Sequence, residues 1–127
     1  IYEDAEIFAT NLHKSRVMTK REYGTYMAMY SSIVSQLSPP DLLIYLRCSV
    51  KTARKRIAAR GRPEERNIPV SYIRRIHKLY ENWFEKWDAG PTLVIETDEM
   101  DYIRDLAYKA DMLKRIEAVL GQRPLAF

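Results

Sequence analysis

Residues Leu42–Cys48 read LLIYLRC, a nearly continuous apolar run between Pro40-Asp41 and Ser49. A short apolar run bounded by turn residues is typical of a strand that is buried on both faces, as in a parallel sheet. A second run, Thr92–Thr97 (TLVIET), follows a break at Gly90-Pro91. Because helical patterns separate the two runs, the sequence predicts an α/β fold with parallel strands.

Apolar residues at helical spacing predict about five helices around these strands. They cover residues of about 2–12, 19–37, 50–60, 71–87 and 102–120. Thr19 begins the second helix with Glu22 three residues later, which is a capping box. Two parallel strands cannot protect their own edges or complete a sheet. We therefore expect further strands outside this sequence, most simply before Ile1.

The composition is that of a folded globular chain: 46% of the 127 residues are hydrophobic and 30% are charged. No apolar run approaches the ~20 residues of a membrane span, and the acidic N-terminus does not resemble a signal peptide. Cys48 is the single cysteine, which excludes an intrachain disulfide and favours a cytoplasmic location. With only His13 and His77 beside it, no metal site is expected within these residues.

Positive charge is concentrated in one segment. Residues 51–66 hold seven basic side chains and two acidic ones, although the whole chain has a net charge of only +4. A focused positive patch indicates an anionic ligand. A solvated helix face remains the alternative.

Three arginines in this segment can converge on a phosphate. Arg56 and Arg60 are four residues apart and share a helix face, and Arg62 follows just after the helix. Guanidinium groups offer planar, bidentate donors to phosphate oxygens. The loop from Gly61 to Pro69 has almost no apolar anchor, so it could close as a lid. Glu64 and Glu65 could accept hydrogen bonds from a sugar hydroxyl, or could simply neutralise the arginines.

Asp4 and Phe8 are also four residues apart on one predicted helix face. A carboxylate beside an aromatic ring can bind a nucleobase, the acid accepting from an exocyclic amine while the ring stacks. The alternative is an Asp favoured by the helix dipole and an ordinary core Phe. The sequence contains no Gly-x-x-x-x-Gly-Lys loop.

Two stretches of this sequence resemble the deoxyribonucleoside kinases. Residues 1–12 (IYEDAEIFATNL) are similar to the segment after that family's Asp/Glu-Arg-Ser motif, and residues 56–65 (RIAARGRPEE) are similar to its lid, Arg-x-x-x-Arg-Gly-Arg-x-x-Glu. The resemblance covers nearly all of residues 1–120. Pro63 and residues 87–91 look most like the bacterial deoxyadenosine/deoxyguanosine kinase branch, which implies a purine acceptor.

The resemblance implies transfer of the ATP γ-phosphate to the 5′-hydroxyl of a deoxynucleoside. For the nucleoside it implies that Asp4 binds the base edge, Phe8 stacks on the base, and Glu65 holds the 3′-hydroxyl, with Glu64 a weaker candidate. For ATP it implies that Arg56 and Arg60 hold phosphates, that Arg60 and Arg62 act in catalysis, and that a loop borders the adenine: Glu99, Met100, Asp101 and Tyr102.

The same resemblance places the P-loop, the general-base carboxylate and the Mg²⁺ site upstream of Ile1. Residues 1–127 are then the C-terminal part of a single P-loop-kinase-type domain, with a lid at about 56–69, and we expect them to be inactive alone. The helix at about 19–37 would form a homodimer interface.

Two other functions stay open. A thymidylate-kinase-like nucleotide kinase would also carry an arginine-rich lid. A basic helical module could bind nucleic acid through residues 51–66, but Glu64 and Glu65 interrupt that patch and no aromatic residues interleave it for base stacking. We therefore expect neither nucleic acid nor a membrane as partner.

Overall fold

The computed structural model describes residues 3, 5–100 and 106–121. The chain divides into two compact units, which we call the helical unit (Ile1–Ser38 with Ala53–Trp87) and the strand unit (Pro39–Thr52 with Asp88–Phe127). Within the described residues there are two parallel strands and five α-helices. The predicted α/β class, with two strands and about five helices, is therefore confirmed.

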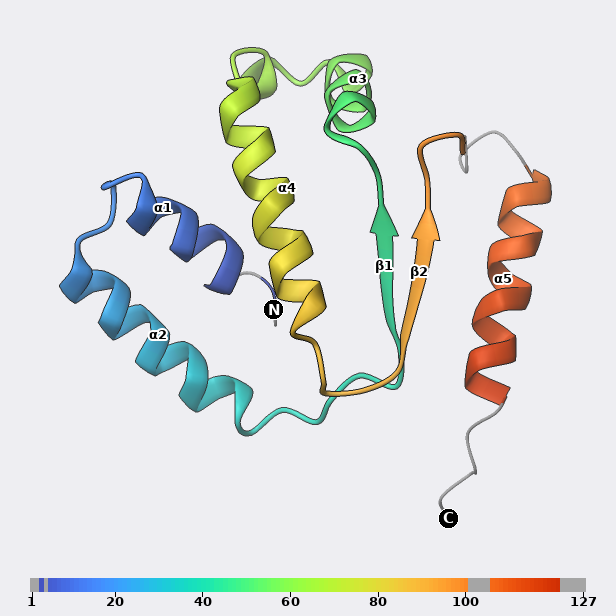
Figure 1. Cartoon of the computed structure of the whole chain (residues 1–127), viewed down its shortest axis with the longest axis horizontal. Coiled ribbons are helices and arrows are strands. Elements are labelled where there is room, and N and C mark those ends of the chain that lie inside the picture. Colours follow the sequence, from blue (N-terminus) through green and yellow to red (C-terminus); the bar gives the residue numbers. More distant parts are fainter. Residues whose placement is uncertain (1–2, 4, 101–105, 122–127) are drawn as a thin grey trace. The chain divides into compact units, whose positions relative to one another are not determined.

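The strand unit is built on a parallel pair of strands, β1 (Leu43–Arg47) and β2 (Thr92–Glu96), which lie side by side in Figure 1. Leu43 is opposite Thr92 at one end of the pair, and Arg47 is opposite Glu96 at the other. Helix α5 (Leu106–Gly121) packs on β2, where Arg115 Nη2 donates to the Val94 carbonyl at 3.0 Å. Ile95 is completely buried and forms the centre of this unit.

The expectation that β1 is buried on both faces is wrong. Ile44 and Leu46 are exposed, and they alternate with partly buried residues at 43, 45 and 47. Successive side chains of a strand point to opposite faces. Among the described residues, one face of β1 is covered and the other is not.

Short hydrogen bonds join the carboxyl ends of the two strands. The Thr97 backbone N–H and hydroxyl both donate to the Arg47 carbonyl, at 2.8 and 3.0 Å. The Ser49 backbone N–H donates to Asp98 Oδ1 at 2.7 Å. Ser49 Oγ in turn accepts from the Thr52 N–H at 3.2 Å, so Ser49 caps α3 (Val50–Arg60).

The helical unit holds the remaining helices. In chain order they are the π-helix η1 (Ala5–Ala9), α1 (Thr10–Lys14), α2 (Lys20–Val34), most of α3, the 3₁₀ turn η2 (Pro63–Glu65) and α4 (Val70–Glu85). Its core contains Ala5, Ile7 and Ala9 from η1 and Trp83 from α4. The predicted helix at about 2–12 is thus a π-helical turn followed by a short α-helix that ends at Lys14.

Helix α2 begins at the predicted capping box. Glu22 Oε2 accepts from the Thr19 backbone N–H at 2.8 Å, and the Glu22 N–H donates to Thr19 Oγ1 at 3.3 Å. Helix α2 contacts η1 and α1. The Tyr23 ring stacks on His13 at 4.7 Å between centroids, and its hydroxyl is 3.0 Å from Thr10 Oγ1.

None of the helices that the structure describes is both long enough and apolar enough to cross a bilayer.

The capping box predicts a pH dependence of stability. Hydrogen bonds from the Thr19 backbone N–H and then its hydroxyl hold the pKa of Glu22 below its ordinary 4.5, because both favour the charged carboxylate. The stabilisation is therefore fully present above pH 4.5 and is lost as the pH falls through the lowered pKa. We expect E22Q to be less stable than wild type at neutral pH, and the difference to shrink in acid. Urea unfolding followed by circular dichroism measures it; a difference that grows on acidification contradicts the prediction.

Candidate functional site

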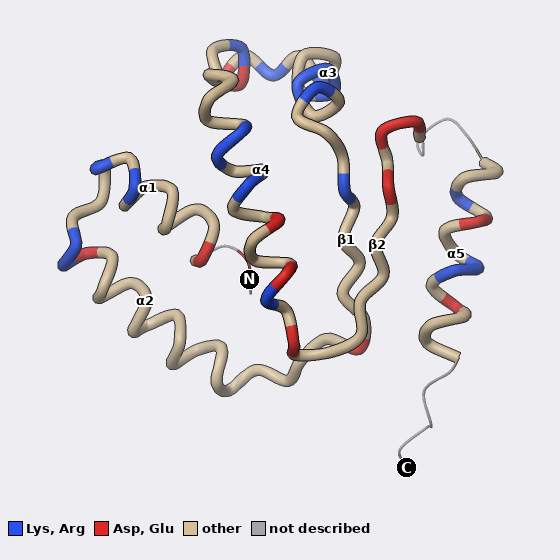
Figure 2. The backbone as a smooth tube through the Cα atoms, in the orientation of Figure 1, with Lys and Arg blue, Asp and Glu red and all other residues tan. Residues whose placement is uncertain are grey.

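The basic segment lies along α3 and the turn that follows it. Figure 2 shows Lys and Arg along α3, with acidic residues joining them in the turn before α4. Arg56 is partly buried, and Arg60, one turn later on the same face, ends the helix. Arg56 and Arg60 therefore share a helix face, and their convergence on a phosphate stays a prediction.

Arg60 and Glu65 form a bidentate ion pair. Arg60 Nε lies 3.0 Å from Glu65 Oε2, and Arg60 Nη2 lies 2.8 Å from each carboxylate oxygen. Arg62 Nη1 approaches the same carboxylate at 3.6 Å. The Glu65 side chain is only 16% exposed, against 49% for Arg60. The carboxylate expected to hold a sugar hydroxyl therefore contacts the arginines expected to hold phosphate.

The backbone at Gly61 makes this pair possible. Gly61 has φ of +68°, a left-handed conformation that costs glycine little, and its N–H donates to the Ile57 carbonyl at the end of α3. The chain reverses there, and Pro63 opens the short turn η2. The expected charged loop thus contains a defined turn that brings Glu65 back to Arg60.

Phe8 lies in η1 with 39% of its surface exposed, while its neighbours Ile7 and Ala9 are buried. Its ring meets Tyr80 of α4 edge to face, with centroids 6.4 Å apart and planes at 85°. Phe8 is therefore not an ordinary core residue, and part of its ring is open to a stacking partner. Asp4, its predicted companion, lies outside the described residues.

Three residues near Phe8 were not singled out from the sequence. Tyr80 is one of the apolar residues whose spacing predicts the helix at about 71–87. Asn11 is 3% exposed, and its Oδ1 accepts from Arg75 Nε of α4 at 3.2 Å. The sequence does contain a signal for Asn11. It is four residues after the buried Ile7, at a helix position that faces the core and usually carries an apolar side chain.

The predicted adenine loop belongs to the strand unit. Met100 is partly buried, and its N–H donates to the Thr97 carbonyl at 3.1 Å in a turn; Glu99 is exposed. Asp101 and Tyr102 lie outside the described residues. The nucleotide-binding role of this loop stays a prediction, as do the roles of the arginines and of Phe8.

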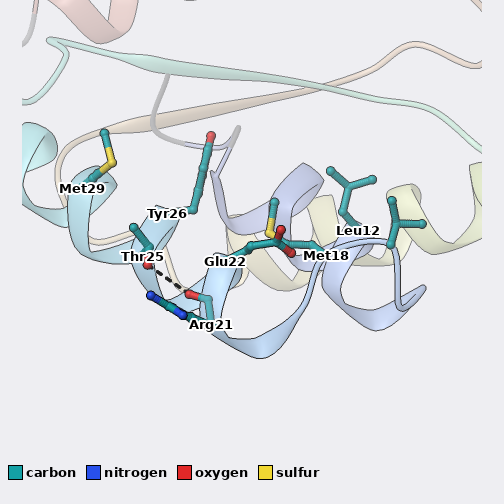
Figure 3. Close-up of a pocket in the computed structure, with 8 residues that line it drawn as sticks. Leu12, Met18, Arg21, Glu22, Thr25, Tyr26 and Met29 are labelled. Atoms are coloured by element: carbon teal, nitrogen blue, oxygen red, sulfur yellow. Dashed lines mark hydrogen bonds between the residues drawn. The ribbon is translucent and has the colours of Figure 1, made fainter.

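A pocket of about 530 Å³ opens on the α1–α2 side of the helical unit (Figure 3). It is lined by Leu12, Val17, Met18, Arg21, Glu22, Thr25, Tyr26 and Met29. It includes none of the predicted site residues, and it lies on the helix expected to form a dimer. Across the residues that the structure describes, no group of three or more His, Cys, Asp or Glu side chains could hold a metal ion.

Comparison with known proteins gives matches along nearly the whole chain. A family model described as deoxynucleoside kinase matches residues 1–121. The deoxyguanosine kinase of Lactobacillus acidophilus is 34% identical over 125 residues, which cover 91% of this chain and 54% of that protein. The deoxyadenosine/deoxycytidine kinase of Bacillus subtilis is 32% identical over 124 residues, which cover 94% of this chain and 56% of that protein.

A solved structure is also similar. The deoxyadenosine kinase from M. mycoides with bound dCTP superposes with a TM-score of 0.75 at 32% identity, covering 91% of this chain and 60% of that one. The likeness agrees with the predicted fold, an incomplete parallel sheet of the P-loop-kinase type. The chain spans about half the length of the curated relatives it matches.

Two glycines give a matched test of the turn at the end of α3. In G61A the new side chain meets no atom within 4 Å, but the positive φ is strained, so we expect a loss of about 1 kcal/mol in unfolding free energy. In G24A, inside α2 with equally open surroundings, we expect a gain of about 0.5–1 kcal/mol. Urea unfolding measures both; changes of the same sign would contradict the assigned role of Gly61.

Proposed function

Since this chain belongs to the deoxynucleoside kinase family, we propose that its protein transfers the γ-phosphate of ATP to the 5′-hydroxyl of a deoxynucleoside. The observation that carries the proposal is the cluster of Arg60, Arg62 and Glu65 at the end of α3. A purine acceptor is supported by the relatives that are named for deoxyguanosine and deoxyadenosine, although the Bacillus subtilis relative is also named for deoxycytidine.

The ion pair suggests how the lid works. A triphosphate carries more negative charge than one carboxylate and offers the same bidentate geometry, so it competes with Glu65 for Arg60 and Arg62. Once released, Glu65 can accept a hydrogen bond from the 3′-hydroxyl of the sugar. ATP takes Arg60 from Glu65, and the nucleoside takes Glu65 from Arg60. Each ligand therefore frees the residue that the other ligand binds, so ATP and the nucleoside bind cooperatively.

Arg60 and Arg62 have a second task in this proposal. Negative charge spreads over the oxygens of the transferring phosphoryl group, and preoriented guanidinium groups stabilise it. Arg56, one turn earlier on α3, would hold the ATP phosphates. Glu99, Met100, Asp101 and Tyr102 are proposed to border the adenine.

The nucleoside is proposed to lie along α4. Tyr80, which contacts Phe8, is ten residues after Val70 at the start of α4, which is roughly 15 Å along the helix. The base would stack on Phe8, with Asp4 at its edge, while the sugar extends toward Glu65 in the turn before α4.

We infer that other parts of the catalytic machinery lie outside these residues. The sequence has no P-loop, and the described residues form no Mg²⁺ site. We propose that the P-loop, the general base and the ligands of an ATP-bound Mg²⁺ belong to a part of the protein outside this sequence. Use of ATP and the single cysteine support a cytoplasmic location.

Kinase activity is tested with protein expressed from its complete reading frame. A coupled ADP-release assay with deoxyadenosine, deoxyguanosine and deoxycytidine should show turnover, and R60A should lower kcat by roughly 10³-fold or more. R54A, which removes an exposed arginine of the same helix, should keep wild-type activity. No turnover, or equal losses in both variants, contradicts the proposal. A nucleoside monophosphate that is the better acceptor would favour a thymidylate-kinase-like enzyme instead.

Helix α2 is proposed to form a homodimer interface. None of its residues is buried, and it exposes large apolar side chains on one face, with Met29 62% and Ile33 55% exposed. Tyr26 and Met29 also line the apolar pocket of Figure 3. An apolar patch of this kind often marks a protein–protein contact, and a twofold dimer would cover it with the same face of a second copy.

Charge placed on this face should break the dimer. Met29 and Ile33 are one turn apart, and a glutamate at either position would bury an unpaired charge at the interface. We expect M29E and I33E to be monomers, and S31E, which changes the opposite side of the same helix, to remain a dimer. Light scattering after gel filtration measures the mass; dimers in all three variants would exclude α2 as the interface.

A further inference from the structure

The π-helical turn η1 carries Phe8 and is packed on more than one side. Ala5, Ile7 and Ala9 are buried, and η1 contacts α1, α2 and α4 within the helical unit. π-Helical turns are rare and often lie at functional sites. Apolar packing is non-directional, so these contacts alone do not determine how η1 is rotated against α4.

A directional contact is supplied one turn after Phe8. Asn11 is almost completely buried, and Arg75 Nε donates to its Oδ1 at 3.2 Å. A buried amide without a partner is destabilising, and a charged donor strengthens the bond. Because hydrogen bonds require a narrow range of distances and angles, this bond restricts how α1 lies on α4.

Two contacts therefore attach the same pair of segments. The Phe8 ring meets Tyr80, and Asn11 meets Arg75. The residue number rises from Phe8 to Asn11 and falls from Tyr80 to Arg75, so the two segments run past each other in opposite directions. A rotation or slide that broke the polar contact would also move the Phe8 ring.

We propose that Asn11 and Arg75 are positioning residues for nucleoside binding: their hydrogen bond holds η1 so that Phe8 presents its ring to the base. This inference rests on the proposed kinase function. Neither residue touches the substrate; both act through Phe8. Their effect falls on the nucleoside and leaves ATP, which is bound by the arginines of α3, unaffected.

Adjacent arginines on α4 provide a matched pair of variants. R75M removes the donor and R74M changes the neighbouring exposed arginine. In steady-state kinetics on protein from the complete reading frame, R75M should raise KM for the deoxynucleoside about tenfold, with KM for ATP, measured at saturating deoxynucleoside, unchanged. R74M should alter neither value. A nucleoside KM in R75M equal to that in R74M overturns the proposal.

Substitutions of Asn11 test the other partner. N11D keeps an acceptor for Arg75 and should preserve the nucleoside KM, whereas N11L removes it and should raise that KM as R75M does. Equal impairment in N11D and N11L overturns the proposal. If N11L does not fold, the pair R75M and R74M decides, because both change exposed helix positions. The double variant N11L/R75M should be no worse than either single variant.

Hydrogen exchange separates this inference from the proposed function. Amides of residues 5–11 should exchange faster in R75M than in R74M, without any substrate. If residues 5–11 exchange at equal rates in R75M and R74M, and the wild-type protein has kinase activity, the positioning role is overturned. Faster exchange in R75M, together with no turnover of any deoxynucleoside by wild type, overturns the proposed function instead.

Discussion

The parallel pairing of β1 with β2 is the constraint on which the rest of the chain depends. Parallel neighbours cannot be joined by a tight turn, so the chain must return to the starting end of the sheet before β2 begins. The segment between Arg47 and Thr92 makes this return, and it contains α3, the turn at Gly61 and α4. The candidate phosphate-binding residues are thus part of the crossover that parallel pairing demands.

The same pairing places the start of α3 and the start of the loop after β2 at one edge of the strand pair. Both strands end together at Arg47 and Glu96, and ligands of open parallel sheets bind beyond the carboxyl ends of the strands. Helix α3, which carries Arg56 and Arg60, begins shortly after β1 at that edge. The predicted adenine loop, with Glu99 and Met100, begins shortly after β2 at the same edge. The hydrogen bond from the Ser49 backbone N–H to Asp98 joins the residue before α3 to the residues that follow β2. This bond therefore holds the start of α3 beside the start of the loop.

Local signals in the sequence predicted the elements well, and non-local contacts account for what they missed. The Thr19–Glu22 capping box and the two apolar runs each depend on a few neighbouring residues. The structure confirms the box at the start of α2 and a strand in each run. Exposure of Ile44 could not be predicted, because burial of a strand depends on which layers cover it. The Arg60–Glu65 pair depends on the left-handed turn at Gly61, and the Asn11–Arg75 bond joins residues 64 positions apart. Candidate residues could therefore be named from type and spacing, but their present partners could not.

The π-helical turn at Ala5–Ala9 makes chain length, as well as side-chain identity, a determinant of the site. A π-helix closes each turn with one residue more than an α-helix. Deleting a single residue there would allow an ordinary α-helix to form without breaking the chain. Because the deletion removes the extra residue of the wide turn, the segments on either side of it would keep nearly the same orientation about the helix axis. A one-residue deletion within this turn would thus remove the wide turn that carries Phe8 while leaving α1 and its polar contact with α4 in place, a change that no point substitution can reproduce.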